Sequence, residues 1–182
     1  MLKIVIPARE MYNEKTNEFM NIDETILELE HSLRSLSKWE AKWHKNFLGQ
    51  KDMSYEELID YVRCMTLNDS INPSIYYLLT DDDLYTIGDY VNDTHSATVI
   101  YHANKNRGPR KKQTITAEII YYLMFAMNIP MECENWHLNR LLTLIEVTDI
   151  KNTPPKKVKA KEARAWQRTE NERRRKMLNT KG

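Results

Sequence analysis

Glycine, cysteine and long apolar runs are all scarce in this sequence of 182 residues. Its four glycines argue against glycine-rich phosphate loops and against propellers or barrels that need repeated tight turns. The longest uninterrupted apolar run, residues 119–127, has nine residues, whereas a membrane-spanning helix needs about twenty. We therefore expect a helix-rich protein without a transmembrane segment.

Only two cysteines are present, Cys64 and Cys133, and they lie far apart in the sequence. The first residues, MLKIVIPARE, lack the apolar stretch and the cleavage site of a signal peptide. We therefore expect an intracellular protein in which both thiols are reduced core residues rather than partners in a disulfide.

Acidic and basic residues are unevenly distributed along the chain, although the overall net charge is only +1. Residues 151–182 hold twelve Lys or Arg against three Glu, a net charge of +9. The preceding residues hold 15 basic and 23 acidic side chains, a net charge of −8. Because Pro154 and Pro155 mark a linker, we divide the chain into a body that ends at residue 150 and a basic C-terminal arm, 151–182.

Hydrophobic periodicity predicts a mainly α fold with a small N-terminal β-hairpin. Residues 2–7 and 18–22 are short strand-like runs, so we expect a hairpin or extension over residues 1–22. From Asp23 the apolar residues recur at spacings of three and four, which predicts a helix that begins at Asp23 or Thr25 and ends at Gly49. The residues of this stripe are Ile26, Leu29, Leu33, Leu36, Trp43 and Phe47, interrupted by Glu40.

Several shorter helices are expected in the rest of the body, 23–150. Ser54 and Glu57 have the spacing of a capping box, Asn72-Pro73 suits a helix start, and Thr80 with the following aspartates suits another. Residues 92–114 have no lasting period and are expected to form an exposed loop or boundary. Thr116 is expected to cap a helix that is apolar around nearly its whole circumference and therefore buried on most sides.

The segment ECENWHLNRLL, residues 132–142, has the greatest density of reactive side chains. Cys133 and His137 could face one metal ion or act together in nucleophilic catalysis. The sequence offers no clear set of further ligands for a metal site and no glycine-rich turn for the oxyanion hole of a catalytic site. We favour a helix start at which Glu132 and Glu134 oppose the macrodipole. Trp136 and Leu138 would then pack, with His137 and Arg140 at the rim.

The basic arm has the composition of a partner-binding segment. Its three glutamates allow favourable i,i+4 pairs, so an exposed helix or docking on an acidic protein surface is at least as well supported as nucleic-acid binding. The acidic body, in the same chain or in a neighbouring copy, is a candidate partner. The arm residues of interest are Lys156, Lys157, Lys159, Arg164, Trp166, Arg168, Arg173, Arg174 and Arg175.

The combination of TAEIIYYLMFAMNIPMECENWHLNRLLTLI with the earlier LELEHSLRSLSKWEAKWHKNF resembles small morphogenesis proteins of tailed bacteriophages, most closely the tail-assembly chaperones. The resemblance covers mainly residues 115–147. It implies a non-enzymatic, oligomeric protein without a cofactor, present in the host cytoplasm, that binds tape-measure or tail-tube subunits. It also implies that Trp136, Leu138, Leu141 and Leu142 are core or interface residues, and it assigns no catalytic residue.

Two other functions remain open at this point. The protein could instead be a structural virion subunit of the head, neck or tail, whose termini bind neighbouring copies. It could also bind nucleic acid through residues 156–176, and an enzyme is the least supported class.

Overall fold

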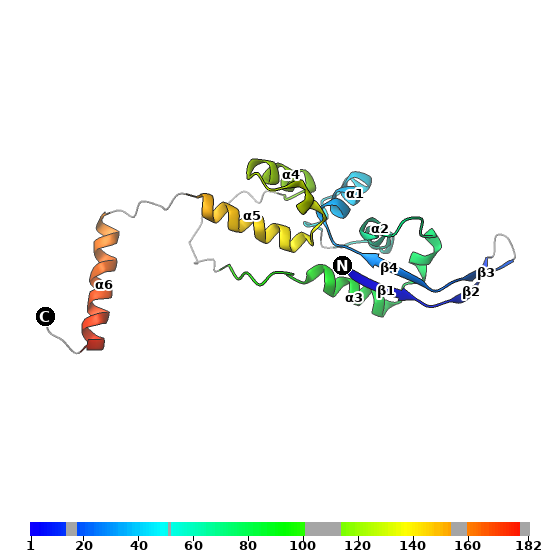
Figure 1. The fold of residues 1–182 in the computed structure, drawn as a ribbon, viewed down its shortest axis with the longest axis horizontal. Helices are drawn as coiled ribbons and strands as arrows, with labels where there is room; N and C mark the ends of the chain where they lie inside the picture. The colour runs from blue at the N-terminus through cyan, green and yellow to red at the C-terminus, as the bar shows by residue number, and fades with distance from the viewer. Residues whose placement is uncertain (14–17, 51, 101–113, 154–159, 179–182) are drawn as a thin grey trace. The chain divides into compact units, whose positions relative to one another are not determined.

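The structure is a computed structural model that describes residues 1–13, 18–50, 52–100, 114–153 and 160–178. It is mainly α with short strands at the N-terminus, which confirms the expected fold class (Figure 1). Two compact units can be separated, residues 1–149 and residues 150–182. Among the described helices, none combines the length and the apolar character needed to cross a membrane.

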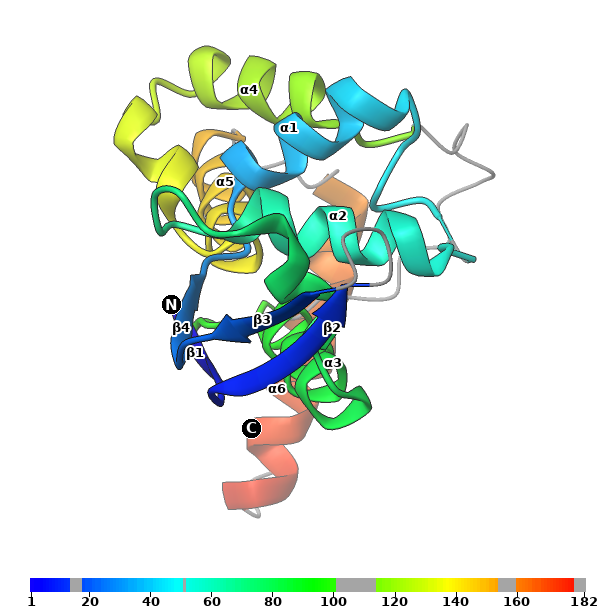
Figure 2. The same ribbon diagram turned by 90° about the vertical axis from the view of Figure 1, so that its right-hand side faces the viewer.

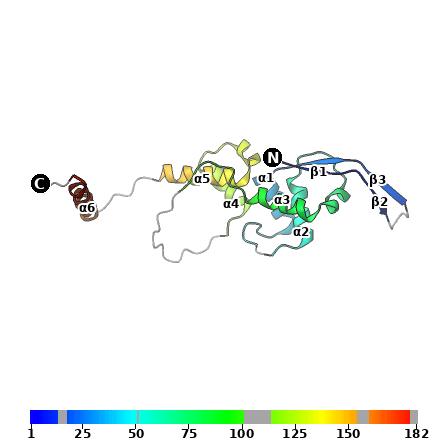
Figure 3. The ribbon, with the colours of Figure 1, turned by 90° about the horizontal axis from the view of Figure 1, so that it is seen from below.

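The N-terminal hairpin is longer than expected and has a different register. The strands are β1 (Leu2–Ile6), β2 (Arg9–Asn13), β3 (Glu18–Ile22) and β4 (Thr25–Leu29). β2 pairs with β3, and β1 pairs with β4, both antiparallel. The expected pairing of residues 2–7 with residues 18–22 is therefore wrong, and β2 and β3 extend past the helices of this unit (Figures 1 and 3).

The first helix begins later than its apolar spacing predicts. Residues 25–29 form β4 rather than helix, and α1 spans Leu33–Trp43. Ser32 caps α1 through a capping box with Ser35, so neither Asp23 nor Thr25 is the cap. The helix ends at His44, whose φ of 53° is left-handed, and not at Gly49.

Three of the shorter helices begin where their capping residues predict. Ser54 and Glu57 form the expected capping box of α2 (Tyr55–Met65), and Thr80 caps α3 (Asp81–Asn92). Asn72 caps η1 (Pro73–Leu78), which is a 3-10 helix with proline at its start. The described residues after α3, 93–100, contain no helix or strand, and residues 101–113 of the expected loop lie outside the described part.

A buried carboxylate, and not Thr116, binds the first amide of α4 (Ala117–Ala126). Thr116 is the N-cap residue but makes no side-chain capping bond. Glu40 of α1 accepts hydrogen bonds from the backbone N–H of Ala117 at 2.7 Å and from that of Phe47 at 3.0 Å. The residue that interrupts the apolar stripe of α1 therefore joins α1 to α4, which lie side by side (Figure 2).

The first unit has two hydrophobic clusters, and α1 contributes to both. One cluster holds the inward faces of β1 and β4 together with α2, η1 and α3, and its largest buried side chain is Trp39. The other joins α1 and α4 to η2 (Met131–Asn135) and α5 (Leu138–Asn152). The second cluster therefore contains the segment that carries the family resemblance.

The described helix of the second unit is α6 (Ala160–Leu178). The division between the units falls after Asp149, whereas the sequence suggested a boundary after residue 150. Residues 154–159, including Lys156, Lys157 and Lys159, lie outside the described part.

Candidate functional site

The reactive-looking segment ECENWHLNRLL is built into the second cluster as two helices. Residues 131–135 form η2, so the expected helix start at Glu132 and Glu134 belongs to a short 3-10 helix, and the long helix α5 begins only at Leu138. Glu134 instead accepts a hydrogen bond from the hydroxyl of Tyr121 at 2.8 Å. Burial, with Glu132 nearby, raises the pKa of the Cys133 thiol. A raised pKa disfavours the thiolate that a nucleophile or a metal ligand requires.

The four predicted core or interface residues divide into two pairs. Leu138 and Leu141 are fully buried, so both are core residues. Trp136 and Leu142 are partly buried and pack against the same cluster. The guanidinium of Arg140 lies 4.2 Å from the centre of the Trp136 ring, which is the geometry of a cation–π contact. This segment therefore contributes more to packing than to an open binding surface.

An exposed apolar face on α4 is a better candidate for partner binding. Ala117, Ile120 and Met124 are buried along one side of the helix. Tyr122 and Phe125 lie on another side and are 68% and 64% exposed. The expectation that α4 is buried on most sides is therefore wrong.

Two neighbouring positions add apolar surface to the same segment. Ile115, two residues before α4, is 47% exposed, and Met131 at the start of η2 is 40% exposed. Large apolar side chains that are exposed together on one short segment are typical of protein interaction sites. The all-round apolar composition of this helix is the sequence signal for this surface, but composition alone does not show how much of the helix is buried within one chain.

Three histidines that are far apart in the sequence meet at the junction of β4, α3 and α5. The ring of His137 lies 5.1 Å from that of His31 and 4.0 Å from that of His95, measured between ring centres. His137 is buried, so the expected rim position for it is wrong, whereas Arg140 is exposed as expected. Sequence spacing gave no sign of this cluster because its members are separated by more than forty residues.

Hydrogen bonds fix the protonation state of His137. Its Nε2 lies 3.0 Å from the carbonyl oxygen of Tyr90, which can only accept, so Nε2 carries the proton. The backbone N–H of Asn139 donates to Nδ1 at 3.3 Å. Burial is the largest influence and lowers the pKa of this ring. Both ring nitrogens therefore already have partners in the neutral form.

His31 is also held neutral. Its Nδ1 lies 2.5 Å from the hydroxyl of Tyr61, and its side chain is almost fully buried. Burial, followed by the proximity of His137 and His95, lowers its pKa to about 3. In the described part of the chain, no group of three or more His, Cys, Asp or Glu residues is arranged to hold a metal ion. The histidine cluster therefore acts in this fold as a packed, hydrogen-bonded junction.

The described side chains of the basic arm lie on an exposed helix. Arg168, Arg173, Arg174 and Arg175 are all exposed, and Arg174 forms an i,i+4 ion pair with Glu170 at 3.6 Å. The side chains of Arg164 and Trp166 lie outside the described part.

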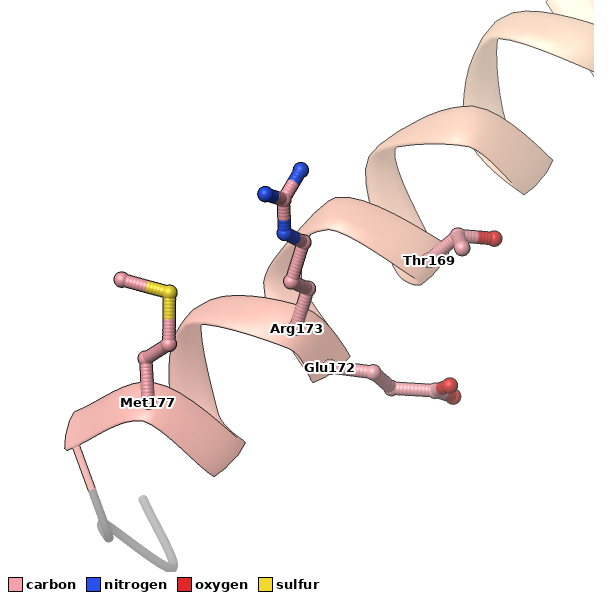
Figure 4. A pocket seen from close by; sticks show the side chains of 4 residues that line it. All are labelled: Thr169, Glu172, Arg173 and Met177. Atoms are coloured by element: carbon pink, nitrogen blue, oxygen red, sulfur yellow. The ribbon is translucent and has the colours of Figure 1, made fainter.

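A shallow hollow on α6 is lined by Thr169, Glu172, Arg173 and Met177. Figure 4 shows the Arg173 guanidinium extending away from the Glu172 carboxylate. Both charged groups are therefore turned outward, where a partner could contact them.

Comparisons with protein families, with curated proteins and with solved structures find no match to this chain.

Proposed function

We propose that the protein acts without catalysis or a cofactor, through protein–protein contacts during assembly of a tailed-bacteriophage particle, as a tail-assembly chaperone. The observation that carries this proposal is the exposed pair Tyr122 and Phe125 on α4. This pair lies within residues 115–147, the segment that resembles the chaperones. A helix that presents apolar side chains to solvent can dock in an apolar groove or receive an apolar segment of a partner.

The partner expected from the resemblance is a tape-measure or tail-tube subunit. A chaperone of this kind would cover apolar surface of an unassembled subunit in the host cytoplasm and leave before the tail is complete. Tyr122 and Phe125 suit that role because aromatic side chains contribute large contact areas at interfaces. The packed residues Leu138 and Leu141 would then support the helix that presents this face.

A structural virion subunit is the second candidate, supported by the β2–β3 ribbon and by α6. The β2–β3 ribbon extends past the helices of the first unit, and α6 is an exposed basic helix. Such segments could bind neighbouring copies in a particle. A third candidate is nucleic-acid binding, supported by the consecutive exposed arginines 173–175.

Quantitative mass spectrometry of purified phage particles separates the first two candidates. A chaperone is required for tails to form but is absent from finished particles, whereas a structural subunit remains in stoichiometric amount. Normal tails made without the protein would contradict both.

The nucleic-acid candidate is tested by DNA binding at low and high salt, with and without residues 152–182. Salt-dependent binding that is lost with the arm would support it. Binding that is unchanged by the deletion, or absent at low salt, would exclude it.

A further inference from the structure

The solvent side of α3 carries two carboxylates, one of which the stability of the helix does not explain. Asp82, Tyr85 and Asp89 are spaced three and four residues apart and are exposed, with Tyr85 exposed by 75%. A carboxylate near the start of a helix is favourable, but Asp89 lies in the last turn, where its negative charge is unfavourable beside the negative end of the macrodipole. No basic residue occupies that turn. The exposed Asp89 carboxylate is therefore available to a basic partner.

The side chain of Tyr85 adds a feature that a solvated acidic helix does not need. Together with Asp81 and Leu84, it lines a hollow on the surface of α3. An exposed tyrosine beside a hollow and between two carboxylates can contact an arginine guanidinium through its ring face. We call the surface formed by Asp82, Tyr85 and Asp89 the α3 face.

The exposed side of α6 carries two arginines with matching spacing. Arg168 and Arg175 are both exposed and are seven residues apart, as are Asp82 and Asp89. Seven helical residues correspond to about 10.5 Å along a helix axis, close to two turns. Two arginines on one helix can therefore meet two aspartates on another in a single register.

We propose that α6 of one copy docks along the α3 face of a second copy of this chain. Arg168 and Arg175 pair with Asp82 and Asp89, and Tyr85 lies between the two charge pairs. Arginine suits this role because its planar guanidinium can bind a carboxylate through two parallel hydrogen bonds and can stack on an aromatic ring. This proposal deepens the proposed function, because it rests on the protein acting through protein contacts and identifies one of them.

The chemistry of the contact determines how it should respond to salt. Charged groups at the surface are strongly screened once the Debye length falls to about 3 Å at 1 M salt. The association should therefore be concentration-dependent at 50 mM salt and weaken at least tenfold at 1 M salt. Docking of apolar surface alone would not weaken in this way.

Two charge-reversed full-length chains test the contact directly. The arm-reversed chain carries Arg168→Glu and Arg175→Glu, and the face-reversed chain carries Asp82→Lys and Asp89→Lys. Each chain alone presents like charges on α6 and on the α3 face, so each should stay monomeric in analytical ultracentrifugation. An equimolar mixture should associate, because the two introduced glutamates on α6 of one chain then meet the two introduced lysines on the α3 face of the other.

Matched controls keep the number of reversed charges constant. Arg34→Glu with Lys38→Glu reverses two exposed cations on α1, and Asp23→Lys with Glu24→Lys reverses two exposed anions between β3 and β4. Both controls should self-associate as the unaltered chain does. Circular dichroism checks that helix content is retained in all variants.

Three results would overturn the proposal. The unaltered chain could be monomeric at low salt at every concentration, both reversed chains could associate like the controls, or the mixture could stay monomeric. The last result would show that these charge pairs do not form between chains. None of these results concerns Tyr122 and Phe125, so the proposed binding of phage subunits is tested separately.

Discussion

Acidification should destabilise the first unit because His31 must gain a proton in a buried site. Its pKa is lowered from the ordinary 6.5 to about 3 by burial and by the neighbouring histidines. The unfolded chain therefore binds a proton more readily than the folded chain, and stability is lost as the pH falls from 6.5 toward 3. Above pH 6.5 the ring is neutral in both states and the full stability is present.

The magnitude at pH 5 follows from the two pKa values. At pH 5 the unfolded ring is mostly protonated and the folded ring is mostly neutral, which costs about 2 kcal/mol relative to pH 7. Burial also lowers the pKa of His137, so its titration acts in the same direction. The free energy of unfolding should thus fall by at least about 2 kcal/mol between pH 7 and pH 5.

Urea unfolding at the two pH values measures this difference, and His31→Gln tests its source. The variant lacks the titrating ring, so its loss of stability between pH 7 and pH 5 should be smaller by about 2 kcal/mol. The matched control is His44→Asn, which removes an exposed ring at the C-cap of α1 and should keep the loss of the unaltered chain. Equal losses in His31→Gln and in the unaltered chain would refute the argument, as would NMR evidence that His31 is protonated at pH 6.

Other substitutions test the packing and capping described above. Glu40→Ala should lower the free energy of unfolding by about 2 kcal/mol in urea titration, because the amides of Phe47 and Ala117 lose their acceptor; a change under about 0.5 kcal/mol would contradict the role of Glu40. Ser54→Ala should lower the free energy of unfolding by about 1 kcal/mol, because α2 loses its cap, while Ser54→Asp should retain most of the stability of the unaltered chain. Leu141→Ala should cost about 2 to 5 kcal/mol, because the side chain is fully buried. Tyr122→Ser should change stability by less than about 1 kcal/mol and should reduce capture of phage structural proteins from infected cells; retained capture would argue against the α4 face.

The capping boxes of α2 and α3 were predictable from the local sequence. The starts of α2 and α3 follow from Ser54 and Thr80. In each capping box the side-chain oxygen of this residue accepts a hydrogen bond from the backbone N–H three residues later, and the carboxylate of that later residue accepts one from the backbone N–H of the capping residue. These interactions need only a few neighbouring residues. They can therefore be predicted without knowledge of the rest of the fold.

The strand β4 could not be predicted in the same way. Ile26 and Leu29 fit the helical spacing of α1, but Leu27 and Leu29 also fit an alternating strand. Pairing with β1 places Leu27 opposite Ile4 and Leu29 opposite Leu2, and both leucines are fully buried. The local sequence fits a helical and a strand periodicity about equally well, so the long-range pairing with β1 determines that these residues form a strand.

The exposed aromatic pair of α4 and the histidine cluster were missed for different reasons. Helix periodicity shows that α4 has much apolar surface, but it does not show how much of that surface the same chain can cover. The histidines meet only after β4, α3 and α5 have packed together. Neither feature has a local sequence motif, although the first supports the proposed function.

Site-specific photo-crosslinking from the α4 face tests the central proposal most directly. A photoreactive phenylalanine analogue at position 122 would be compared with the same analogue at position 77, where the native tyrosine is exposed on η1. In infected cells, the account predicts a crosslink from position 122 to a tape-measure or tail-tube subunit and little or none from position 77. Absence of any phage structural protein among the crosslinks from position 122, or equal yields from both positions, would contradict it.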